Sequence, residues 1–538
     1  MSLGPRKGKP RGRPTPVGIL TAKRDPLFTA TYIPEPALEF GNHGHEFDPR
    51  VGLGIHGPVD RRDPARRAPI RLGLIGTGPL IDKFRAWMSR CQREVVPVRR
   101  YRWRGETVVQ RTDPSLVPAF PGVRAVLDTD FILNDQFVET LSSTEVNEIE
   151  TGFALFEPRV TRLAQILGER LDVLADKATV PDVVVVALPT SIRKVCTVPS
   201  NQRRRGKTAA SLWELLHKSL AKDQAVGQLN LMDVAGAHGV DLAEDRREVL
   251  VLHSALKIRG MRVGLPTQLI WENTLDGIGV EDDATCAWNV WSAVYYKANN
   301  ELWRIAGPEA NSCFVGISFY KDRHDERLRS CVAQAFSDRG AGLVLRSEPF
   351  PWDDQDEKTP HLNRAMAAGL LRRVIDAYRQ HLQIQPRRVV IHKWQRFWPD
   401  ELSGFGETLQ SANVPSHDFV AFGSRGLRFY RAGQEPPLRG TFIALGPSQG
   451  LLFTRGYVPF LKRYPGMRVP RPLEIVEHHG SASMSQIAQE ILALTKLDWN
   501  TTMFAGKEPI TTAFAHDVAE IVRELPDEAL KTSYRFYM

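Results

Sequence analysis

Residues 70–78 read Ile70-Arg-Leu-Gly-Leu-Ile-Gly-Thr-Gly78, an apolar strand that breaks into a glycine turn, and residues 79–91 continue with the apolar periodicity of a helix. A second run, Pro181-Asp-Val-Val-Val-Val-Ala-Leu-Pro189, is apolar without alternation. Continuous apolar strands are typical of parallel sheets that are covered on both faces. The first half of the chain is therefore predicted to form a doubly wound α/β domain.

The second half shows the same organisation. Residues 311–320 and 389–392 are strand-like, and residues 361–381 between them carry apolar side chains at helical spacing. A helix between two strands of one sheet makes a crossover connection. The predicted fold class is α/β with two doubly wound domains. We expect a basic tail and linker-like segment at 1–69, a first domain at 70–305 and a second domain at 306–538.

The composition of the 538 residues favours a soluble protein with a polyanionic partner. No run approaches the ~18–20 apolar residues that a membrane span requires. The 71 lysines and arginines outnumber the 62 acidic residues, which gives a net charge of +9. Five dispersed cysteines without a C-x-x-C pair, and an N-terminus without an apolar signal region, predict a cytoplasmic location. The basic tail at residues 1–14 could contact phosphates or simply be solvated.

The glycines of residues 73–78 invite a different interpretation, a turn that binds a dinucleotide. Their spacing does not match the pattern G-x-G-x-x-G. A plain tight turn is therefore favoured, and a nucleotide-binding Rossmann enzyme is the least favoured alternative.

Four polar side chains could bind one phosphate. His253 and Lys257 lie four residues apart in a helical pattern, which places them on one helix face. Gln268 and Lys297 follow as further donors. A terminal phosphate carries up to two negative charges and needs several donors to replace its water shell. On the residues alone the plainer interpretation, unrelated surface residues on amphipathic helices, stays open.

The succession of motifs around these residues resembles the MID and PIWI domains of short prokaryotic Argonautes. The resemblance covers most of the chain and depends on the order of the motifs, because none of them is specific alone. The main motifs are Leu252-His-Ser-Ala-Leu-Lys257, Leu265-Pro-Thr-Gln268, Tyr295-Tyr-Lys-Ala298, Val315-Gly-Ile-Ser-Phe-Tyr-Lys321, Val390-Ile-His-Lys393 and Tyr534-Arg-Phe-Tyr-Met538.

The resemblance implies a Rossmann-like MID domain and an RNase H-like PIWI domain. It implies that His253, Lys257, Gln268 and Lys297 bind the 5′ phosphate of a guide RNA. The C-terminal carboxylate of Met538 is expected near that phosphate, with a bridging Mg²⁺ and no organic cofactor.

The resemblance also implies the partners. Complementary single-stranded DNA would be the target. A heterodimeric partner with an APAZ region would carry a nuclease (DNase) domain, slightly favoured, or a TIR or Sir2 NADase domain. Such pairs act against plasmids or phage, and target binding could drive higher assembly.

The chain departs from slicing Argonautes at the positions of their catalytic carboxylates. Those enzymes hold two metal ions with acidic side chains, whereas the matching positions here are Ser318 and Trp394. We therefore expect no slicing.

Cationic side chains near strand ends and loops are expected to contact the backbone of a guide–target duplex, and these are Lys393, Arg396, Arg425, Arg428, Arg455, Lys462 and Arg463. The alternative is an autonomous metal-dependent guided nuclease that uses residues 353–357, Asp498, His478 or His479.

Overall fold

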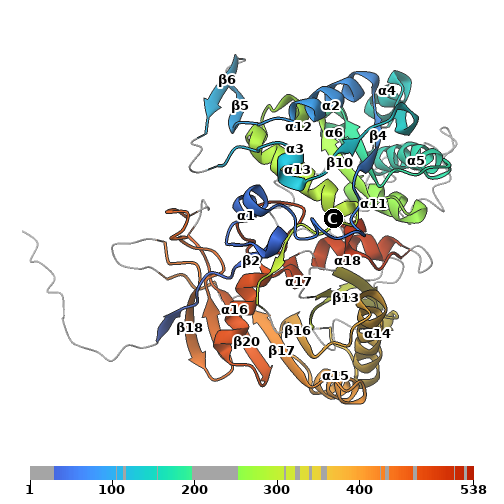
Figure 1. Cartoon of the computed structure of the whole chain (residues 1–538). Helices are drawn as coiled ribbons and strands as arrows, with labels where there is room; N and C mark the ends of the chain where they lie inside the picture. The colour runs from blue at the N-terminus through green and yellow to red at the C-terminus, as the bar shows by residue number, and fades with distance from the viewer. Residues whose placement is uncertain are drawn as a thin grey trace, which may run out of the picture.

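The computed structural model of the chain contains two α/β domains, one above the other in Figure 1. It describes residues 29–103, 106–112, 117–153, 155–196, 252–307, 311–321, 328–337, 342–352, 360–423, 426–429, 436–464, 469–513, 515–525 and 530–538. The predicted fold class is confirmed, with a parallel first sheet and a mixed second sheet. Within these ranges, no helix has the length and apolar character needed to cross a bilayer.

The first domain is built on a parallel sheet with the order β10-β9-β4-β7, and β8 also pairs with β4. Its strands are β4 (Ile70–Gly76), β7 (Phe131–Ile132), β8 (Val138–Thr140), β9 (Val183–Leu188) and β10 (Thr267–Trp271). Its helices are α2 (Gly78–Arg90), α3 (Val123–Leu127), α4 (Ser143–Thr151), α5 (Phe156–Ala175), α6 (Thr190–Cys196), α11 (Leu252–Val263), α12 (Glu272–Asp276) and α13 (Asp283–Lys297).

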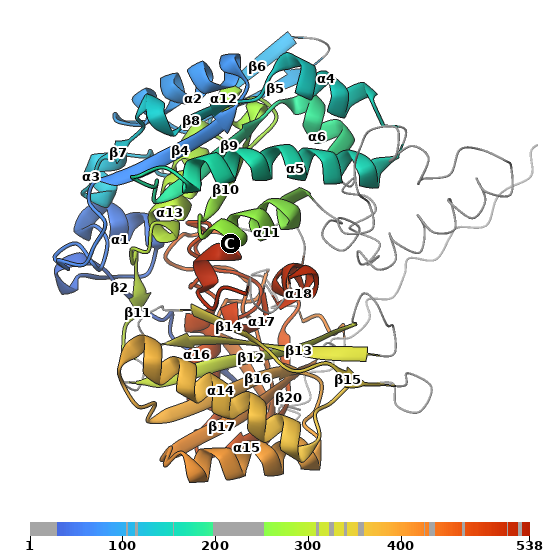
Figure 2. The ribbon, with the colours of Figure 1, turned by 90° about the vertical axis from the view of Figure 1, so that its right-hand side faces the viewer.

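Helices cover both faces of this sheet, as the continuous apolar run of β9 predicts (Figure 2). Val183 packs in the cluster that includes α2 and α13, whereas its neighbour Val184 packs in the cluster that includes α5. A two-stranded hairpin of β5 (Val98–Trp103) and β6 (Glu106–Arg111) extends from the domain.

The second domain has a mixed sheet with the order β1-β18-β19-β20-β17-β16-β12-β13-β14. Its strands are β12 (Ser312–Lys321), β13 (Leu328–Ser337), β14 (Gly342–Arg346), β15 (Phe350–Pro351), β16 (Arg388–Trp394), β17 (Ser416–Gly423), β18 (Thr441–Gly446), β19 (Gln449–Leu452) and β20 (Leu473–Gly480). Helices α14 (Arg364–Leu382) and α15 (Pro399–Ser411) cover one face. The opposite face carries α16 (Met484–Leu494), α17 (Ile510–Ala513) and α18 (Ala515–Glu524).

Residues 29–58 form an N-terminal strap whose strands pair with the second domain, although they precede the first domain in the chain and also contact α3 of that domain. The strap contains β1 (Ala30–Tyr32), β2 (Leu38–Glu39), β3 (His45–Glu46) and α1 (Pro49–His56). β1 pairs with β18, and β2 pairs with β11 (Arg304–Ile305) at the start of the second domain. The segment expected to be linker-like is therefore folded from residue 30 onward.

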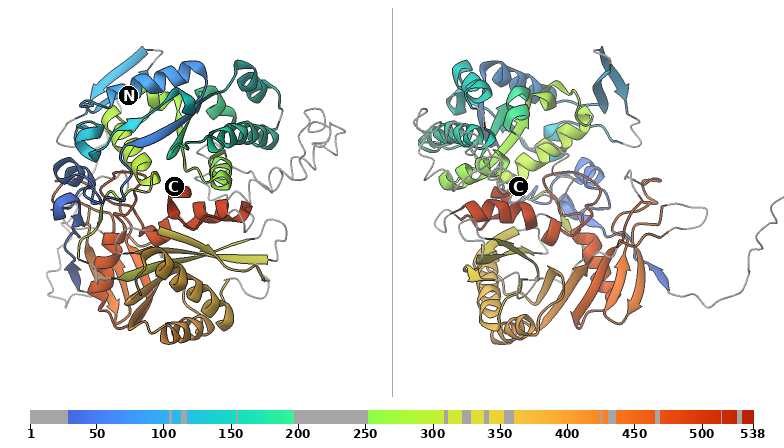
Figure 3. Two further views of the ribbon diagram at one scale, coloured as in Figure 1. Left: turned by 45° about the vertical axis from the view of Figure 1, so that its right-hand side comes forward. Right: turned by 180° about the vertical axis from the view of Figure 1, so that it is seen from behind.

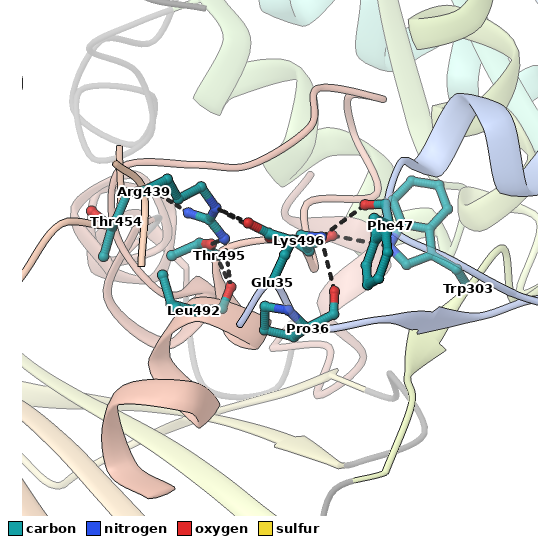
Figure 4. A network of polar contacts seen from close by, with 9 residues as sticks. All are labelled: Glu35, Pro36, Phe47, Trp303, Arg439, Thr454, Leu492, Thr495 and Lys496. Carbon is teal, nitrogen blue, oxygen red and sulfur yellow. Dashed lines mark hydrogen bonds and ion pairs between the residues drawn. The ribbon is translucent and has the colours of Figure 1, made fainter. Parts of the chain in front are cut away.

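A buried network of charges fixes the strap (Figure 4). Glu35 accepts from Arg439 at 2.9 Å and pairs with Lys496 at 2.8 Å. Lys496 also donates to the carbonyl oxygens of Pro36 and Phe47, at 2.9 and 2.8 Å. Because both cations are almost fully buried, the strap supplies the countercharge that they need.

The C-terminus lies between the two domains (Figures 1 and 3). A final turn of 3₁₀-helix, η4 (Tyr534–Phe536), packs against α11 and α13 of the first domain and against β14 of the second. The domains also share an apolar seam, in which Tyr296 stacks on Trp499 with 4.8 Å between ring centroids. The indole NH of Trp499 donates to the carbonyl of Trp303 at 3.1 Å.

Candidate phosphate-binding pocket

Lys257 and Lys297, which are far apart in the sequence, come together between α11 and α13. Lys257 is 2% exposed and Lys297 is 1% exposed. After α11 the chain turns sharply at Gly264, whose φ is +74°, and the Leu265 NH donates to the Gly260 carbonyl at 2.8 Å. This left-handed turn favours glycine and starts β10 beside α11.

Neutral oxygen atoms are the hydrogen-bond partners of both lysines. Lys257 Nζ donates to the Thr267 carbonyl at 2.5 Å. Lys297 Nζ donates to Gln268 Oε1 and, at 3.4 Å, to Asn500 Oδ1. Lys257, Gln268 and Lys297 of the first domain and Asn500 of the second thus form one polar cluster, called the pocket below.

Burial and mutual repulsion make it costly to charge both lysines. Burial lowers the pKa of Lys257 well below its ordinary value, and the neighbouring Lys297 lowers it further. Burial also lowers the pKa of Lys297, to about 7, although contact with Lys257 and the charge of Asp498 act in the opposite direction.

The nearest acidic residue offers little compensation. Asp498 accepts from the Asn500 NH and from Thr501 Oγ1, both at 3.1 Å, and burial raises its pKa. In the part of the chain that the structure describes, no carboxylate forms an ion pair with Lys257 or Lys297. An uncompensated buried ammonium is unfavourable, so the pocket is suited to an anion.

The structure groups three of the four predicted phosphate ligands. Lys257, Gln268 and Lys297 meet in the pocket, whereas His253, one turn earlier on α11, is exposed. Met538 is buried beside α11 and α13, but its carboxylate makes no ion pair with either lysine among the described residues. The structure therefore shows that the C-terminal turn contacts the helices that carry the two lysines. It shows no contact between the terminal carboxylate and the lysines among the described residues.

The side chains of the pocket supply no carboxylate for the expected Mg²⁺, whose expected ligands are the Met538 carboxylate and the phosphate. A magnesium ion needs oxygen ligands in octahedral geometry. The side-chain oxygens of Gln268 and Asn500 already accept from Lys297, whose charge would repel the ion. Among the described residues, no three His, Cys, Asp or Glu side chains are grouped as metal ligands.

Sequence reasoning missed Asn500 and the segment around it. Residues 500–503 run beside α13, where Asn500 contacts Lys297 and Thr502 donates to Asn289 at 3.0 Å through both its NH and its hydroxyl. These contacts join residues about 200 positions apart, and the sequence singled out only Asp498 in this stretch, as a possible metal ligand. The sequence does not show which amide and hydroxyl side chains bind one another. These partners are identified only in the packed structure of the two domains.

A cleft of about 710 Å³ is lined in part by the same segment. Its wall includes Thr502, Met503 and Phe504, and Arg50 of the strap donates to Thr502 Oγ1 at 3.0 Å. The other cations in the lining are Arg439, Arg455, Lys462 and Arg463. Three of the residues predicted to contact nucleic acid, Arg455, Lys462 and Arg463, therefore lie in one cleft.

The prediction that Lys393 contacts a duplex backbone is wrong. Lys393 is 1% exposed, and its Nζ donates to both carboxylate oxygens of Glu401, at 2.7 and 2.6 Å. A phosphate would have to break this buried ion pair to reach the lysine. Arg396 and Arg428 are exposed, and Arg425 lies outside the described residues.

The positions expected to be catalytic contain no carboxylate. Ile317 of β12 is aligned with Lys393 of β16, so Ser318 and Trp394 come next along the same pair of strands. Trp394 is aligned in turn with Phe422 of β17, with 6.0 Å between the ring centroids. The adjoining positions of three strands therefore carry a hydroxyl and two aromatic rings.

Two of the groups considered for another metal site, His478 and Asp498, have other partners. His478 contacts Asp418, which pairs with Arg388 at 2.7 Å in the sheet. Asp498 belongs to the loop beside Lys297. Its hydrogen bonds are with Asn500 and Thr501 and not with His478, Asp418 or Arg388. Residues 353–357 lie outside the described ranges.

Solved Argonaute structures share this fold. The Clostridium butyricum Argonaute, bound to a guide DNA and a 19-mer target DNA, aligns with a TM-score of 0.57 at 13% identity, over 93% of this chain and 53% of that chain. Drosophila Piwi aligns with a TM-score of 0.56 at 13% identity, over 95% and 56%. The A. aeolicus Argonaute aligns with a TM-score of 0.53 at 12% identity, over 94% and 55%.

The chain therefore has an Argonaute-like fold and spans about half the length of these proteins. No family model and no curated protein matches the sequence.

Proposed function

We propose that this chain binds the 5′-phosphorylated end of a small guide RNA and uses the guide to recognise complementary single-stranded DNA. The observation that carries the proposal is the pair of buried lysines, Lys257 and Lys297, whose hydrogen-bond partners are neutral oxygens. A phosphate monoester supplies the negative charge that such a pocket needs, and Gln268 adds a polar group of fixed position.

The adjoining cleft is suited to the part of the guide RNA that follows the 5′ phosphate. Residues 500–503 adjoin both sites, because Asn500 accepts from Lys297 whereas Thr502 and Met503 line the cleft. The cationic side chains of the cleft suit the phosphates of a backbone, and the half-exposed ring of Phe460 offers a surface on which a base can stack.

The experiment that tests this function is a competition between two copies of one short RNA that differ only in a 5′ phosphate or a 5′ hydroxyl. The wild-type chain is expected to bind the phosphorylated RNA at least about tenfold more tightly, the value of one charge-assisted hydrogen bond. Equal affinity for the two RNAs would reject the proposal.

The chemistry of target destruction is proposed to belong to another subunit. The absence of carboxylates at Ser318 and Trp394 supports a chain that recognises without cutting. In this proposal the partner carries an APAZ region with a nuclease domain, or with a TIR or Sir2 NADase domain, and acts in cytoplasmic defence against plasmids or phage. Target binding would activate the heterodimer and could bring copies of it together.

A cleavage assay tests this division of labour. The purified chain, loaded with guide RNA and incubated with labelled complementary DNA and Mg²⁺ or Mn²⁺, is expected to leave the DNA intact. A chain of known slicing Argonaute serves as the positive control in the same buffer. Cutting of the DNA by this chain alone would contradict the proposal and favour the autonomous nuclease.

A further inference from the structure

The hairpin of β5 and β6 carries a concentration of positive charge. Its two strands contain four arginines and a single acidic residue, Glu106. Arg99 and Arg111 are exposed, and in the part of the chain that the structure describes neither forms an ion pair. The hairpin forms a two-stranded sheet of its own and projects from the first domain (Figure 1). These two guanidinium groups are therefore accessible to an anionic partner.

The charge lies on both faces of the hairpin. Arg99 and Tyr101, two residues apart on β5, share one face. Arg111 is opposite Val98 in the register, so it lies on the other face. Charge on both faces of one narrow ribbon suits a partner that presents phosphates on two sides, as the two strands of a duplex do.

Apolar side chains accompany the charges. Tyr101 is 37% exposed and Val109 is 60% exposed. A hairpin of only two strands is marginally stable in water. A partner that covers these side chains would therefore also stabilise the hairpin.

The hairpin is fixed to α13, the helix that carries Lys297. Arg100 donates to Asp283, the first residue of α13, at 2.6 Å, and the Arg100 carbonyl accepts from the Gly279 NH at 2.9 Å. Because Asp283 is buried, this ion pair is little screened by salt. The hairpin is thus attached to the same helix as one of the proposed phosphate ligands.

The same end of α13 contributes to the cleft. Thr285, in the first turn of the helix, lines the cleft together with Val117 and Pro118, which follow β6 in the chain. Trp288 of α13 donates its indole NH to the Pro118 carbonyl at 3.3 Å. The segments that hold the base of the hairpin therefore also form part of the cleft that suits the guide.

The length of α13 gives the spacing between the hairpin and the pocket. Asp283 begins the helix and Lys297 ends it 14 residues later. At about 1.5 Å per residue the two lie about 21 Å apart along the helix axis. A duplex that runs along α13 from the pocket would reach the hairpin after about six base pairs, at about 3.4 Å for each pair.

We propose that the β5–β6 hairpin binds the duplex formed by the guide and its target, with Arg99 and Arg111 on its two faces contacting phosphates. The inference rests on the proposed function and adds a second surface for the same nucleic acid. A guanidinium group can donate two hydrogen bonds to one phosphate. Contacts to the backbone carry no sequence information, so the hairpin would strengthen target binding with any guide.

Target binding at several salt concentrations tests the proposal on the full chain loaded with a 5′-phosphorylated guide RNA. The double variant Arg99→Gln/Arg111→Gln is expected to bind complementary single-stranded DNA at least about tenfold more weakly at low salt. The slope of log affinity against log salt should become shallower by about 1.4–1.8, since each phosphate contact contributes about 0.7–0.9. A DNA that pairs with fewer than about six guide nucleotides should bind the variant and the wild type equally.

Two controls accompany this measurement. The variant is expected to keep the wild-type affinity for the guide RNA alone and the wild-type preference for a 5′ phosphate. The matched double variant is Arg372→Gln/Arg387→Gln, at two exposed arginines of the second domain that form no ion pair among the described residues. It should leave target affinity and the salt slope unchanged.

Three results would overturn the inference, and they are distinguishable. An equal loss of affinity for the guide alone would show that the hairpin contacts a single strand and not the duplex. Unchanged target affinity and salt slope would show that the hairpin binds no nucleic acid and would indicate a protein as its partner. If the wild type showed no preference for 5′-phosphorylated RNA, the proposed function itself would be rejected, and the inference would fall with it.

Discussion

A Lys297→Met variant is expected to bind 5′-phosphorylated RNA about ten- to a hundredfold more weakly than the wild type, with 5′-hydroxyl RNA unaffected. Lys297 is the pocket residue that joins the domains, because its ammonium donates to Gln268 of the first domain and to Asn500 of the second. Loss of one hydrogen bond to a charged group costs about 1.5–3 kcal/mol, which gives this range of affinity. Filter binding with the two RNAs measures it.

The variant is also expected to fold. Methionine removes a buried ammonium whose partners are neutral, so thermal unfolding should show no loss of stability. Lys83→Met is the matched control, since Lys83 belongs to the first domain and pairs with Glu272 at 2.9 Å on its surface. An equal loss of affinity for both RNAs would show that Lys297 supports the backbone path and not the terminal phosphate.

The largest effect on stability is expected for Glu35→Gln, at about 3–5 kcal/mol of unfolding free energy. The glutamine keeps the shape of the side chain but leaves Arg439 and Lys496 buried without their countercharge (Figure 4). Chemical denaturation followed by tryptophan fluorescence measures the loss. Glu407→Gln is the matched control, because Glu407 and its partner Arg364 are exposed, and it should leave the unfolding midpoint unchanged.

The pH dependence of the Glu35 contribution has a defined sign. Burial alone would raise the pKa of Glu35, but Arg439 and Lys496 outweigh burial and hold the pKa below its ordinary value. The stabilisation is therefore present above the unfolded-state pKa of about 4.3 and is lost as the pH falls through the folded-state value. The stability difference between wild type and Glu35→Gln should shrink below about pH 4, and a constant difference would contradict the role of the charge.

The sequence alone was sufficient to predict the long strands and helices. The strands at 70–76, 183–188, 312–321 and 388–394 are nearly continuous apolar runs, and the helix at 364–382 carries apolar side chains at helical spacing, so local pattern and tertiary packing agree. The strap was misjudged because its strands are two or three residues long and pair with distant partners, such as β18. Strands this short carry no periodicity of their own.

Part of the site was also predictable, and the physical reason differs from residue to residue. Lys257 and Gln268 flank one turn between a helix and the next strand, so their proximity follows from local structure. Asn500 comes from another domain and could be placed only by the packed structure. Lys393 was misjudged because a lysine near a strand end is normally solvated, whereas here Glu401 of the following helix folds back onto it.

The pairing of β2 with β11 brings the two segments that connect the domains side by side. The chain leaves the strap and returns to the second domain through neighbouring segments, which are joined by Leu38 opposite Ile305 and by the Val59 NH on the Leu302 carbonyl at 3.0 Å. The first domain is thus an insertion that is tethered at both ends along one line. Any separation of the two domains would have to break the stack of Tyr296 on Trp499, the hydrogen bond between Lys297 and Asn500 and the apolar core that both domains share.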